Sequence, residues 1–527
     1  MRDFHFPGRS AVFADNGMVA TSTPLASQVA IDVLKSGGNA VDAAIAGAVL
    51  LGLCEPQMTG IGGDIFALVK KPGCEEVVTL NGSGRAPAAL TADMVRASGY
   101  TETMPECHPF AVTVPGAIDA FCRLSQDYGV KGLDAVLAPA IHYMKAGVPI
   151  APRTASDWMG TISDFNGAAR RDYTQNGEPF QTGARFALPR QAEVLEKIAK
   201  DGAKAFYEGE IAEDMVLSLR ALGGCHTLED FAAVQSEYGV PIEGTYKGYR
   251  MLEHPPNGHG ATAILLNNIL AQFDLARLEP FGADRVHIEA EAVKLAYDAR
   301  DRFVADMDYM TRLDHMLNPI TGQQLAVLID PKKAMKSAHK QSQNVHKETI
   351  YITVVDKDRM MVSLIYSIFN TFGSSLASEK YGILFHNRGS GFNLIGGHPN
   401  EVAGGKRPMH TIIPAILADA KGMRMPFGVM GGAYQANGHG RFVTNIVDFG
   451  MDPQSAIDAP RSFAYAGELR MERGFGPKVK QTLADMGHKV VVPPTAIGGA
   501  QAIWVDPDNG VLQGASDPRK DGCALGY

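Results

Sequence analysis

The residue best suited to chemistry in this sequence is Thr349, which opens an alternating run of β-branched and aromatic residues over 349–355. The alternation predicts a β-strand, and the preceding segment, 336–347, is polar and predicted to be weakly structured. A flexible tether that leads into a strand beginning with threonine suits a protein that cleaves its own chain. Cleavage of the Glu348–Thr349 bond would free an α-amine with an ordinary pKa of about 8. That amine can act as general base for the hydroxyl of its own residue.

The elements around Thr349 predict a layered α/β protein. Apolar periodicity predicts helices over 27–36, 40–53 and 287–300, with Gly37 and Gly38 ending the first and Asn39 capping the second. Short strands are predicted over 65–69, 349–355, 360–367, 411–417, 426–430 and 500–505. Strands that bracket a helix-rich middle favour helices outside and sheets inside.

Composition narrows the class of protein. The 527 residues are 45% hydrophobic and 20% charged, typical of a soluble globular chain. With 49 basic and 57 acidic residues the net charge is −8, which gives no electrostatic basis for binding nucleic acid. The longest apolar stretch, 40–53, is too short to span a membrane. We therefore expect no nucleic-acid or membrane partner.

The cysteines and histidines suggest neither disulfides nor a metal. Six scattered cysteines without a CxxC pair argue against a disulfide framework and a zinc site, and favour a reducing compartment. Residues 1–8 lack the apolar core of a secretory signal, so we expect a cytoplasmic protein. His254, His259, His287 and His439 match no ligand spacing. No metal and no organic cofactor is predicted.

Motifs along almost the whole chain occur in a characteristic order. They are Thr21-Ser22-Thr23-Pro24, Gly37-Gly38-Asn39-Ala40, Gly60-Ile61-Gly62-Gly63-Asp64, Val114-Pro115-Gly116, His254-Pro255-Pro256-Asn257-Gly258-His259-Gly260, Gly405-Lys406-Arg407-Pro408, Gly431-Gly432, Asp458-Ala459-Pro460-Arg461 and Gly514-Ala515-Ser516-Asp517-Pro518-Arg519. In this order they resemble the γ-glutamyltranspeptidase family of N-terminal-nucleophile hydrolases, and its transpeptidase-like amidohydrolase branch in particular.

The resemblance implies a fold and a set of catalytic residues. The fold is α/β (α+β), a four-layer αββα sandwich, built as one composite domain from a large fragment, 1–348, and a small fragment, 349–527. The two cleavage fragments would form a heterodimer, and a dimer of heterodimers is left open. Thr349 would be the nucleophile, and Gly431 and Gly432 would stabilise the oxyanion. Ser367 would place a hydroxyl beside the nucleophile, although a solvent-facing strand serine is an equal alternative.

The sequence departs from the family pattern at positions where the family binds its substrate. Gly391 stands where the family's aspartate binds the glutamyl α-amine, and His410-Thr411 replaces a serine pair that helps to hold the α-carboxylate. Arg85 is displaced by two positions from the carboxylate-binding arginine, so that role and a surface role are equally open. Losing the ion-pair partner of a substrate amine disfavours γ-glutamyl specificity.

The remaining candidate substrate-binding residues are Arg85, Arg388, Arg407, His410 and Thr411, and they include no obvious anionic partner for a substrate amine. This set suits a small-molecule amide that has a carboxylate and no α-amino group, and oxamate, hydrolysed to oxalate and ammonia, is the best expectation. One alternative is a γ-glutamyl hydrolase or transpeptidase acting on glutathione-like substrates. Another is an unprocessed, non-catalytic homologue, because Ile350 and Tyr351 replace the family's second threonine and its histidine.

Overall fold

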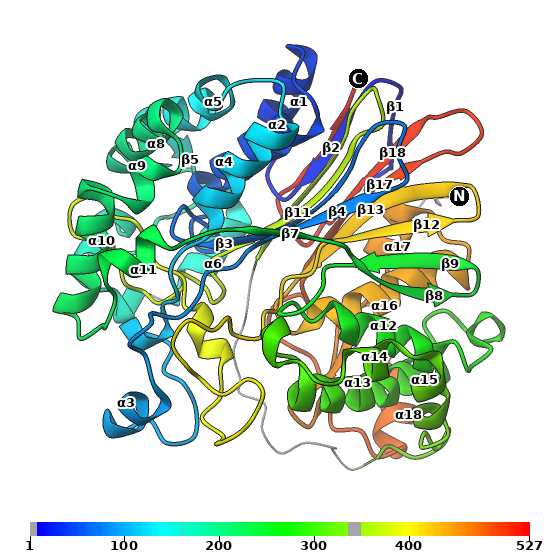
Figure 1. Cartoon of the computed structure of the whole chain (residues 1–527). Helices are drawn as coiled ribbons and strands as arrows, with labels where there is room; N and C mark the ends of the chain where they lie inside the picture. The colour runs from blue at the N-terminus through cyan, green and yellow to red at the C-terminus, as the bar shows by residue number, and fades with distance from the viewer. Residues whose placement is uncertain (1–7, 161, 336–348) are drawn as a thin grey trace.

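Two seven-stranded antiparallel sheets form the centre of the molecule in the computed structural model, which describes residues 8–160, 162–335 and 349–527 (Figure 1). The first, named here the β10 sheet, has the strand order β19 (Cys523–Gly526), β2 (Met18–Thr21), β10 (Ile350–Val355), β11 (Met361–Ser367), β3 (Asp64–Lys70), β4 (Val77–Gly82) and β7 (Glu237–Gly239). The second, the β13 sheet, has the order β1 (Val12–Ala14), β18 (Leu512–Ser516), β17 (Gly499–Val505), β13 (Gly422–Met430), β12 (Ala415–Asp419), β9 (Tyr249–Glu253) and β8 (Ile242–Tyr246).

Helices cover the outer face of each sheet, so the molecule has four layers (Figure 1). On the β10 sheet lie α1 (Pro24–Lys35), α2 (Ala40–Cys54) and α4 (Ala117–Tyr128). On the side of the β13 sheet lie α12 (Gly260–Leu270), α13 (Ala283–Phe303) and α16 (Tyr434–Val447). Between the sheets lies an apolar cluster that includes Met18, Leu68, Leu252, Ile416 and Ile503. The predicted αββα sandwich is confirmed.

The remaining elements extend the two outer layers. The helices are α3 (Ala92–Ala97), α5 (Leu133–Ala146), α6 (Pro152–Trp158), α7 (Gly167–Tyr173), α8 (Pro189–Asp201), α9 (Lys204–Tyr207), α10 (Glu210–Ala221), α11 (Leu228–Ala232), α14 (Leu313–Leu317), α15 (Pro319–Ala326), α17 (Pro453–Asp458) and α18 (Pro477–Asp485). Two small sheets are formed by β5 (Val148–Pro149) with β6 (Arg185–Phe186), and by β14 (Ser462–Tyr465), β15 (Glu468–Met471) and β16 (Val490–Val491).

Local sequence explains how α2 begins. The Asn39 side chain accepts hydrogen bonds from the backbone N–H groups of Val41 and Asp42, and the Asp42 carboxylate accepts one from Asn39, which completes a capping box. Gly37, at φ +90°, turns the chain between α1 and α2 in a conformation that glycine adopts without strain. Every residue of α2 is buried, as its apolar sequence predicts.

The strand predicted over 411–417 begins later than expected, because β12 spans Ala415–Asp419. The backbone N–H of Ile412 donates to His410 Nδ1 at 3.3 Å, and that of Ile413 donates to Gln435 Oε1 at 3.0 Å. These donors are used by side chains and Pro414 has none, so the segment stays outside the sheet despite its β-branched residues.

A buried serine ties the two sheets together. Ser363 Oγ, on β11, donates to the Phe427 carbonyl of β13 at 3.2 Å and accepts from the Ala415 N–H at 3.1 Å. The Tyr351 hydroxyl lies 2.7 Å from Ser363 Oγ. Gly428 permits this approach, since a Cβ there would collide with the Tyr351 ring. The start of β10 is thereby held near the end of β13.

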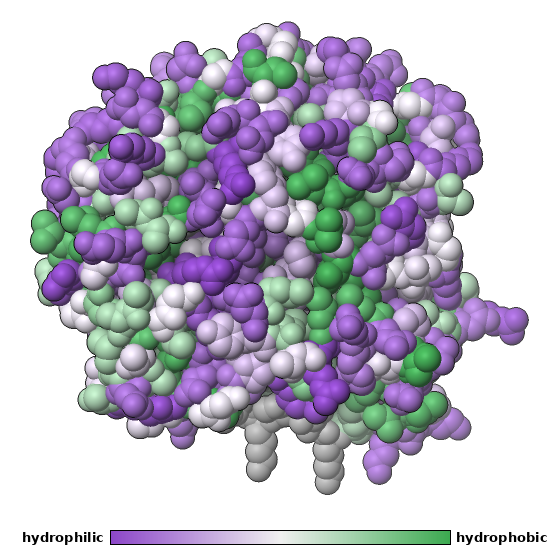
Figure 2. All heavy atoms as spheres, in the orientation of Figure 1, coloured by the Kyte–Doolittle hydropathy of each residue, from purple (hydrophilic) through white to green (hydrophobic). Residues whose placement is uncertain are grey.

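The surface agrees with the composition. The face in Figure 2 is mostly hydrophilic, with hydrophobic residues in separate groups. All six cysteines are free. Of the helices in the described ranges, none has the length and apolar character needed to cross a membrane.

Candidate active site

Antiparallel pairing gathers polar residues at one edge of the β10 sheet. Thr349 precedes β10, Ser367 ends β11, Asp64 begins β3, and Ser83 directly follows β4. The register pairs Ile350 with Tyr366, Ser367 with Asp64, and Ile65 with Gly82. Alternating strand starts and strand ends therefore place these four residues in a row at the same edge.

Thr349 and Ser367 form a buried hydroxyl pair. Their side-chain oxygens lie 3.3 Å apart, and the two residues are 1% and 0% exposed. Ser367 Oγ also accepts a hydrogen bond from the Phe369 N–H at 2.8 Å. Ser367 therefore does not face solvent, and it lies where its hydroxyl can orient Thr349 Oγ1. The predicted cleavage bond, Glu348–Thr349, and the segment 336–348 fall outside the described residues.

Gly431 and Gly432 form the turn from β13 into α16. Their φ angles are +120° and +55°, which glycine adopts readily. At Gly431 a Cβ would lie 2.9 Å from the Cα of Gly498. Met430, the preceding residue, packs in one cluster with Tyr351 and Ile365, so the turn lies at the same end of the sandwich as Thr349. Backbone N–H groups at the start of a 14-residue helix suit the predicted stabilisation of an oxyanion.

Asp64 is the centre of a buried polar cluster that sequence analysis did not assign. Its Oδ2 lies 3.2 Å from His410 Nε2 and 3.3 Å from Arg388 Nε, and its Oδ1 accepts the Gly84 N–H at 3.4 Å. His386 Nδ1 lies 3.8 Å away. Burial by itself would raise the pKa of Asp64, but its three basic neighbours outweigh that effect and hold the pKa well below its usual range. Asp64 is thus a buried carboxylate anion in the same row of strand ends as Thr349 and Ser367.

Arg388 presents two free donors inside this cluster. Its side chain is fully buried, and within the described ranges Nη1 and Nη2 have no hydrogen-bond partner. Its Cζ lies 4.2 Å from the centre of the Phe369 ring, the neighbour of Ser367. Burial lowers the pKa of Arg388 to about 10, so it remains a cation at neutral pH. A buried planar fork without a partner is suited to a carboxylate oxygen pair of a ligand.

His410 contributes a neutral ring and not a positive charge. Burial and the Arg388 cation lower its pKa to about 3. Because Nδ1 accepts the Ile412 N–H, the ring proton is on Nε2 and donates to Asp64. The next residue, Thr411, is 1% exposed, and its hydroxyl has no partner in the described structure. The Asn370 amide group has none either. These atoms and the Arg388 fork are candidate polar contacts for a ligand.

Gly391 adds no side chain to the site. A Cβ at this position would lie 2.6 Å from the Met409 carbonyl oxygen, so even alanine would require a shift. Its own carbonyl accepts a hydrogen bond from Asn400 Nδ2 at 2.7 Å. The position at which the family places an amine-binding aspartate is therefore occupied by close backbone packing.

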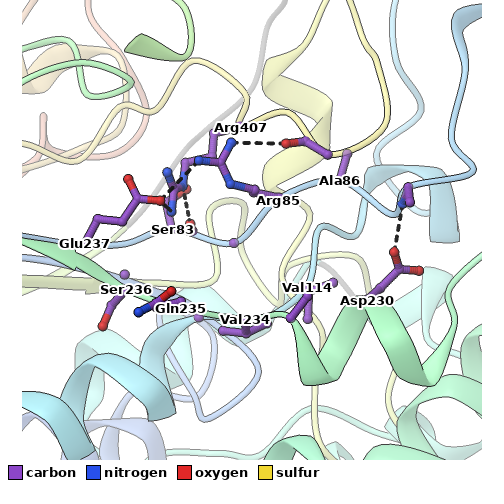
Figure 3. Close-up of a pocket in the computed structure, with 16 residues that line it drawn as sticks. Ser83, Arg85, Ala86, Val114, Asp230, Val234, Gln235, Ser236, Glu237 and Arg407 are labelled. Carbon is purple, nitrogen blue, oxygen red and sulfur yellow. Dashed lines mark hydrogen bonds and ion pairs between the residues drawn. The ribbon is translucent and has the colours of Figure 1, made fainter. Parts of the chain in front are cut away.

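Arg85 and Arg407 line a cavity of about 310 Å³ next to the row of strand ends (Figure 3). Arg85 forms ion pairs with Asp306 and Glu237, both at 3.1 Å. Arg407 Nη2 lies 3.0 Å from Glu237, and its Nε donates to the Ser83 carbonyl at 2.8 Å. Arg85 is 38% exposed at its side chain and Arg407 only 4%. The sequence did not reveal that both arginines already have carboxylate partners.

Three carboxylates in and beside the site were missed for a common reason. Asp64, Glu237 and Asp306 are far apart in the sequence and meet the arginines only in the folded chain. One signal was available for Asp64, because an acid directly before the apolar run of β3 must be buried with a partner. Glu237 and Asp306 lie in segments with no distinguishing pattern.

A buried hydroxyl pair at a strand start, a glycine turn at a helix N-terminus and an αββα sandwich define a hydrolase with an N-terminal nucleophile. The family model for γ-glutamyltranspeptidase matches residues 26–527, and the chain belongs to this family. It is thus a proenzyme hydrolase that acts on amide bonds.

Relatives at similar distances have different activities. The chain is 34% identical to the glutathione hydrolase-like YwrD proenzyme of Bacillus subtilis, over 98% of this chain and 99% of that protein. It is 30% identical to the oxamate amidohydrolase proenzyme of Klebsiella pneumoniae, over 98% and 100%. The structure of a cephalosporin acylase from Bacillus halodurans matches with a TM-score of 0.93 at 36% identity, over 100% and 99% of the two chains. These similarities leave several amide substrates open.

Proposed function

We propose that this self-processing amidohydrolase acts on a small amide that has a carboxylate and no α-amino group, with oxamate as the simplest such substrate. The single observation that supports this is the Arg388 fork, whose two terminal nitrogens are buried beside Asp64 and have no hydrogen-bond partner among the described residues. Asp64 holds the other side of the guanidinium and fixes its direction. The proposal agrees with Gly391, where no carboxylate is available to bind a substrate ammonium.

The chemistry follows from the row of strand ends. After cleavage before Thr349, its α-amine takes the proton of Oγ1, which attacks the amide carbonyl carbon. The Ser367 hydroxyl orients Oγ1, and the backbone N–H groups of Gly431 and Gly432 stabilise the oxyanion. The amine leaving group departs with a proton from the α-amine, and water then hydrolyses the acyl ester on Thr349.

The cavity beside Arg85 favours a second candidate, an acylase acting on a larger amide. Its volume of about 310 Å³ lies at the lower end of the range of about 300–1,000 Å³ for pockets that hold drug-sized ligands. Oxamate would fill a small part of it. A longer acyl chain or a bulky leaving group would use the Arg85 and Arg407 side of the site.

Hydrolysis of oxamate and of its neutral diamide, oxamide, tests the proposal. These substrates differ only in the group that Arg388 would bind. With the wild-type protein we expect kcat/KM for oxamate to exceed that for oxamide by about 10- to 150-fold, the equivalent of about 1.5–3 kcal/mol for hydrogen bonds to a charged group. Arg388→Lys keeps the charge but loses the fork, and should remove most of this preference.

The panel also separates the alternatives. Glutaramate and γ-glutamyl-anilide are added, and Thr349→Ala supplies the blank. Preferred turnover of glutaramate would favour the acylase candidate, and preferred turnover of γ-glutamyl-anilide the glutathione-like one. An oxamate preference that survives in Arg388→Lys would contradict the role of the fork. On a denaturing gel, a wild-type protein that stays at full length would favour the non-catalytic alternative.

A further inference from the structure

A group of three potential metal ligands lies outside the active site, on the helices behind the β13 sheet. His287 and Glu291 are one turn apart on α13, and His488 follows α18. All three are buried, and one ligand atom from each lies within 4.8 Å of the others. Histidine spacing along the sequence did not predict this site, because His488 is 201 residues from His287.

The ligand atoms are close to the spacing that a tetrahedral ion requires. Metal–ligand bonds of about 2.0–2.1 Å at a tetrahedral angle place neighbouring ligand atoms about 3.3 Å apart. His287 Nδ1 and His488 Nε2 are 2.8 Å apart, and His488 Nε2 and Glu291 Oε1 are 3.9 Å apart. The first of these distances must lengthen and the second shorten by about half an ångström, and the third pair, His287 and Glu291, lies within 4.8 Å.

The surroundings already orient one ligand. His287 Nε2 donates to the Asp330 carbonyl at 2.7 Å, so the ring proton is fixed there and the Nδ1 lone pair faces the other two residues. A histidine whose second nitrogen donates to a backbone carbonyl is the usual arrangement for a metal ligand. His488 Nε2 donates its proton to this Nδ1 atom of His287, 2.8 Å away. Its proton must move from Nε2 to Nδ1 when Nε2 binds a metal.

We propose that His287, Glu291 and His488 bind a divalent transition-metal ion, with Zn²⁺ the best match to two imidazoles and a carboxylate. Lys294 is the competitor of that ion, because its Nζ lies 2.6 Å from Glu291 Oε1 and neutralises the carboxylate. The ammonium would have to leave Oε1 when the ion binds. Lys294 is 18% exposed, so it has a path toward solvent.

The site would join the two fragments that self-cleavage leaves, and this role rests on the proposed function. His287 and Glu291 lie in the large fragment, 1–348, and His488 lies in the small fragment, 349–527. Glu291 Oε2 also accepts the Met335 N–H at 2.8 Å. The ion would therefore hold the small fragment to the helix that holds Met335, the last residue described before the segment 336–348.

Zn²⁺ binding to the chelator-treated full chain tests this proposal, measured by competition with a chromophoric chelator. We expect one ion per chain for the wild type and an affinity at least about tenfold lower for His488→Asn. Lys294→Met removes the competing ammonium and should bind Zn²⁺ more tightly than the wild type. His142→Asn, at an exposed position on α5, is the matched histidine control and should bind as the wild type does.

Equal affinity in the wild type and His488→Asn, or weaker binding by Lys294→Met, would overturn the site. If His488→Asn does not fold, Glu291→Gln replaces it, with the Zn²⁺-dependent rise in melting temperature as the measurement. Binding is measured on the uncut Thr349→Ala chain as well as on the wild type. Zn²⁺ bound by an uncut wild type supports the site and contradicts the self-cleavage proposal, so the two failures are distinct.

Discussion

The two hydroxyls at the centre of the site differ in what surrounds them. Ser367 Oγ accepts a backbone N–H from Phe369, which fixes this oxygen 3.3 Å from Thr349 Oγ1, where either hydroxyl can donate to the other. Thr349 precedes its strand, so its side chain is positioned chiefly by this neighbour. Ser363, on the same strand, uses its hydroxyl to join the two sheets. Two buried serines four residues apart thus have different tasks.

Replacing each serine separately should expose this difference. In Ser367→Ala we expect self-cleavage and kcat to fall by about 2- to 12-fold, the worth of one neutral hydrogen bond of about 0.5–1.5 kcal/mol. The melting temperature should fall as well, because the buried Phe369 N–H loses its acceptor. The measurements are the rate of fragment appearance on denaturing gels and steady-state amide hydrolysis.

Ser363→Ala is the matched control. It leaves the Phe427 carbonyl and the Ala415 N–H without their partner, so we expect a lower melting temperature with self-cleavage intact. If Ser363→Ala slowed cleavage as much as Ser367→Ala, proximity to Thr349 would not be the property that matters.

At the scale of elements, the turn between β13 and α16 sets the position of the proposed oxyanion donors. Gly431 has a φ of +120° and packs against Gly498, so both its conformation and its neighbour require glycine. The turn ends at the N-terminus of α16, where backbone N–H groups are not used within the helix. A change in the path of this turn would move the N–H groups of Gly431 and Gly432, which we propose as the oxyanion donors.

Gly431→Ala should lower kcat by about 10²–10³-fold, the effect of losing one oxyanion donor. Gly510→Ala is the control, because Gly510 also has a positive φ of +75° but lies in a turn between β17 and β18, outside the residues of the site. That variant should lose stability without a comparable loss of kcat. Equal kcat losses in the two variants would show that backbone strain and not donor placement explains the effect.

Sequence patterns predicted the elements well where local rules decide the structure. The α2 helix follows from its cap and apolar run, and β10 follows from its alternation. The predicted start of β12 was wrong because the N–H groups of Ile412 and Ile413 donate to the side chains of His410 and Gln435 and not to a neighbouring strand. The Asp64 cluster could not be derived for a similar reason, since its members come from three separate parts of the chain. Tertiary contacts of Arg388, His386 and His410 with Asp64, not strand propensity, bring them together.

At the scale of the whole molecule, neutral histidines in the interior couple stability to pH. Burial lowers the pKa of His226 and His254 to about 4 and that of His410 to about 3. The unfolded chain binds protons at these rings near pH 6.5, whereas the native chain does not. Their contribution is therefore complete above pH 6.5 and is lost as pH falls toward 4. Glu55 and Glu253, whose pKa values burial raises, act in the opposite direction above pH 4.5 and reduce the net slope.

His226→Phe isolates one of these protons. His226 Nε2 donates to the Val112 carbonyl at 2.8 Å, and its Nδ1 has no partner within the described chain, so protonating this ring in the native state is costly. Each histidine that is protonated in the unfolded chain but not in the native chain changes the free energy of unfolding by about 1.4 kcal/mol per pH unit. Between pH 6.5 and 5 the free energy of unfolding of the parent, the uncut Thr349→Ala chain, should therefore fall by about 1.5 kcal/mol more than that of the same chain with His226→Phe. Urea unfolding of the uncut Thr349→Ala chain measures this difference without a dissociation step.

His142→Phe, at an exposed position, is the control and should retain the full dependence of the unfolding free energy on pH. If His226→Phe showed the same pH dependence as the parent, His226 would already titrate normally in the folded protein.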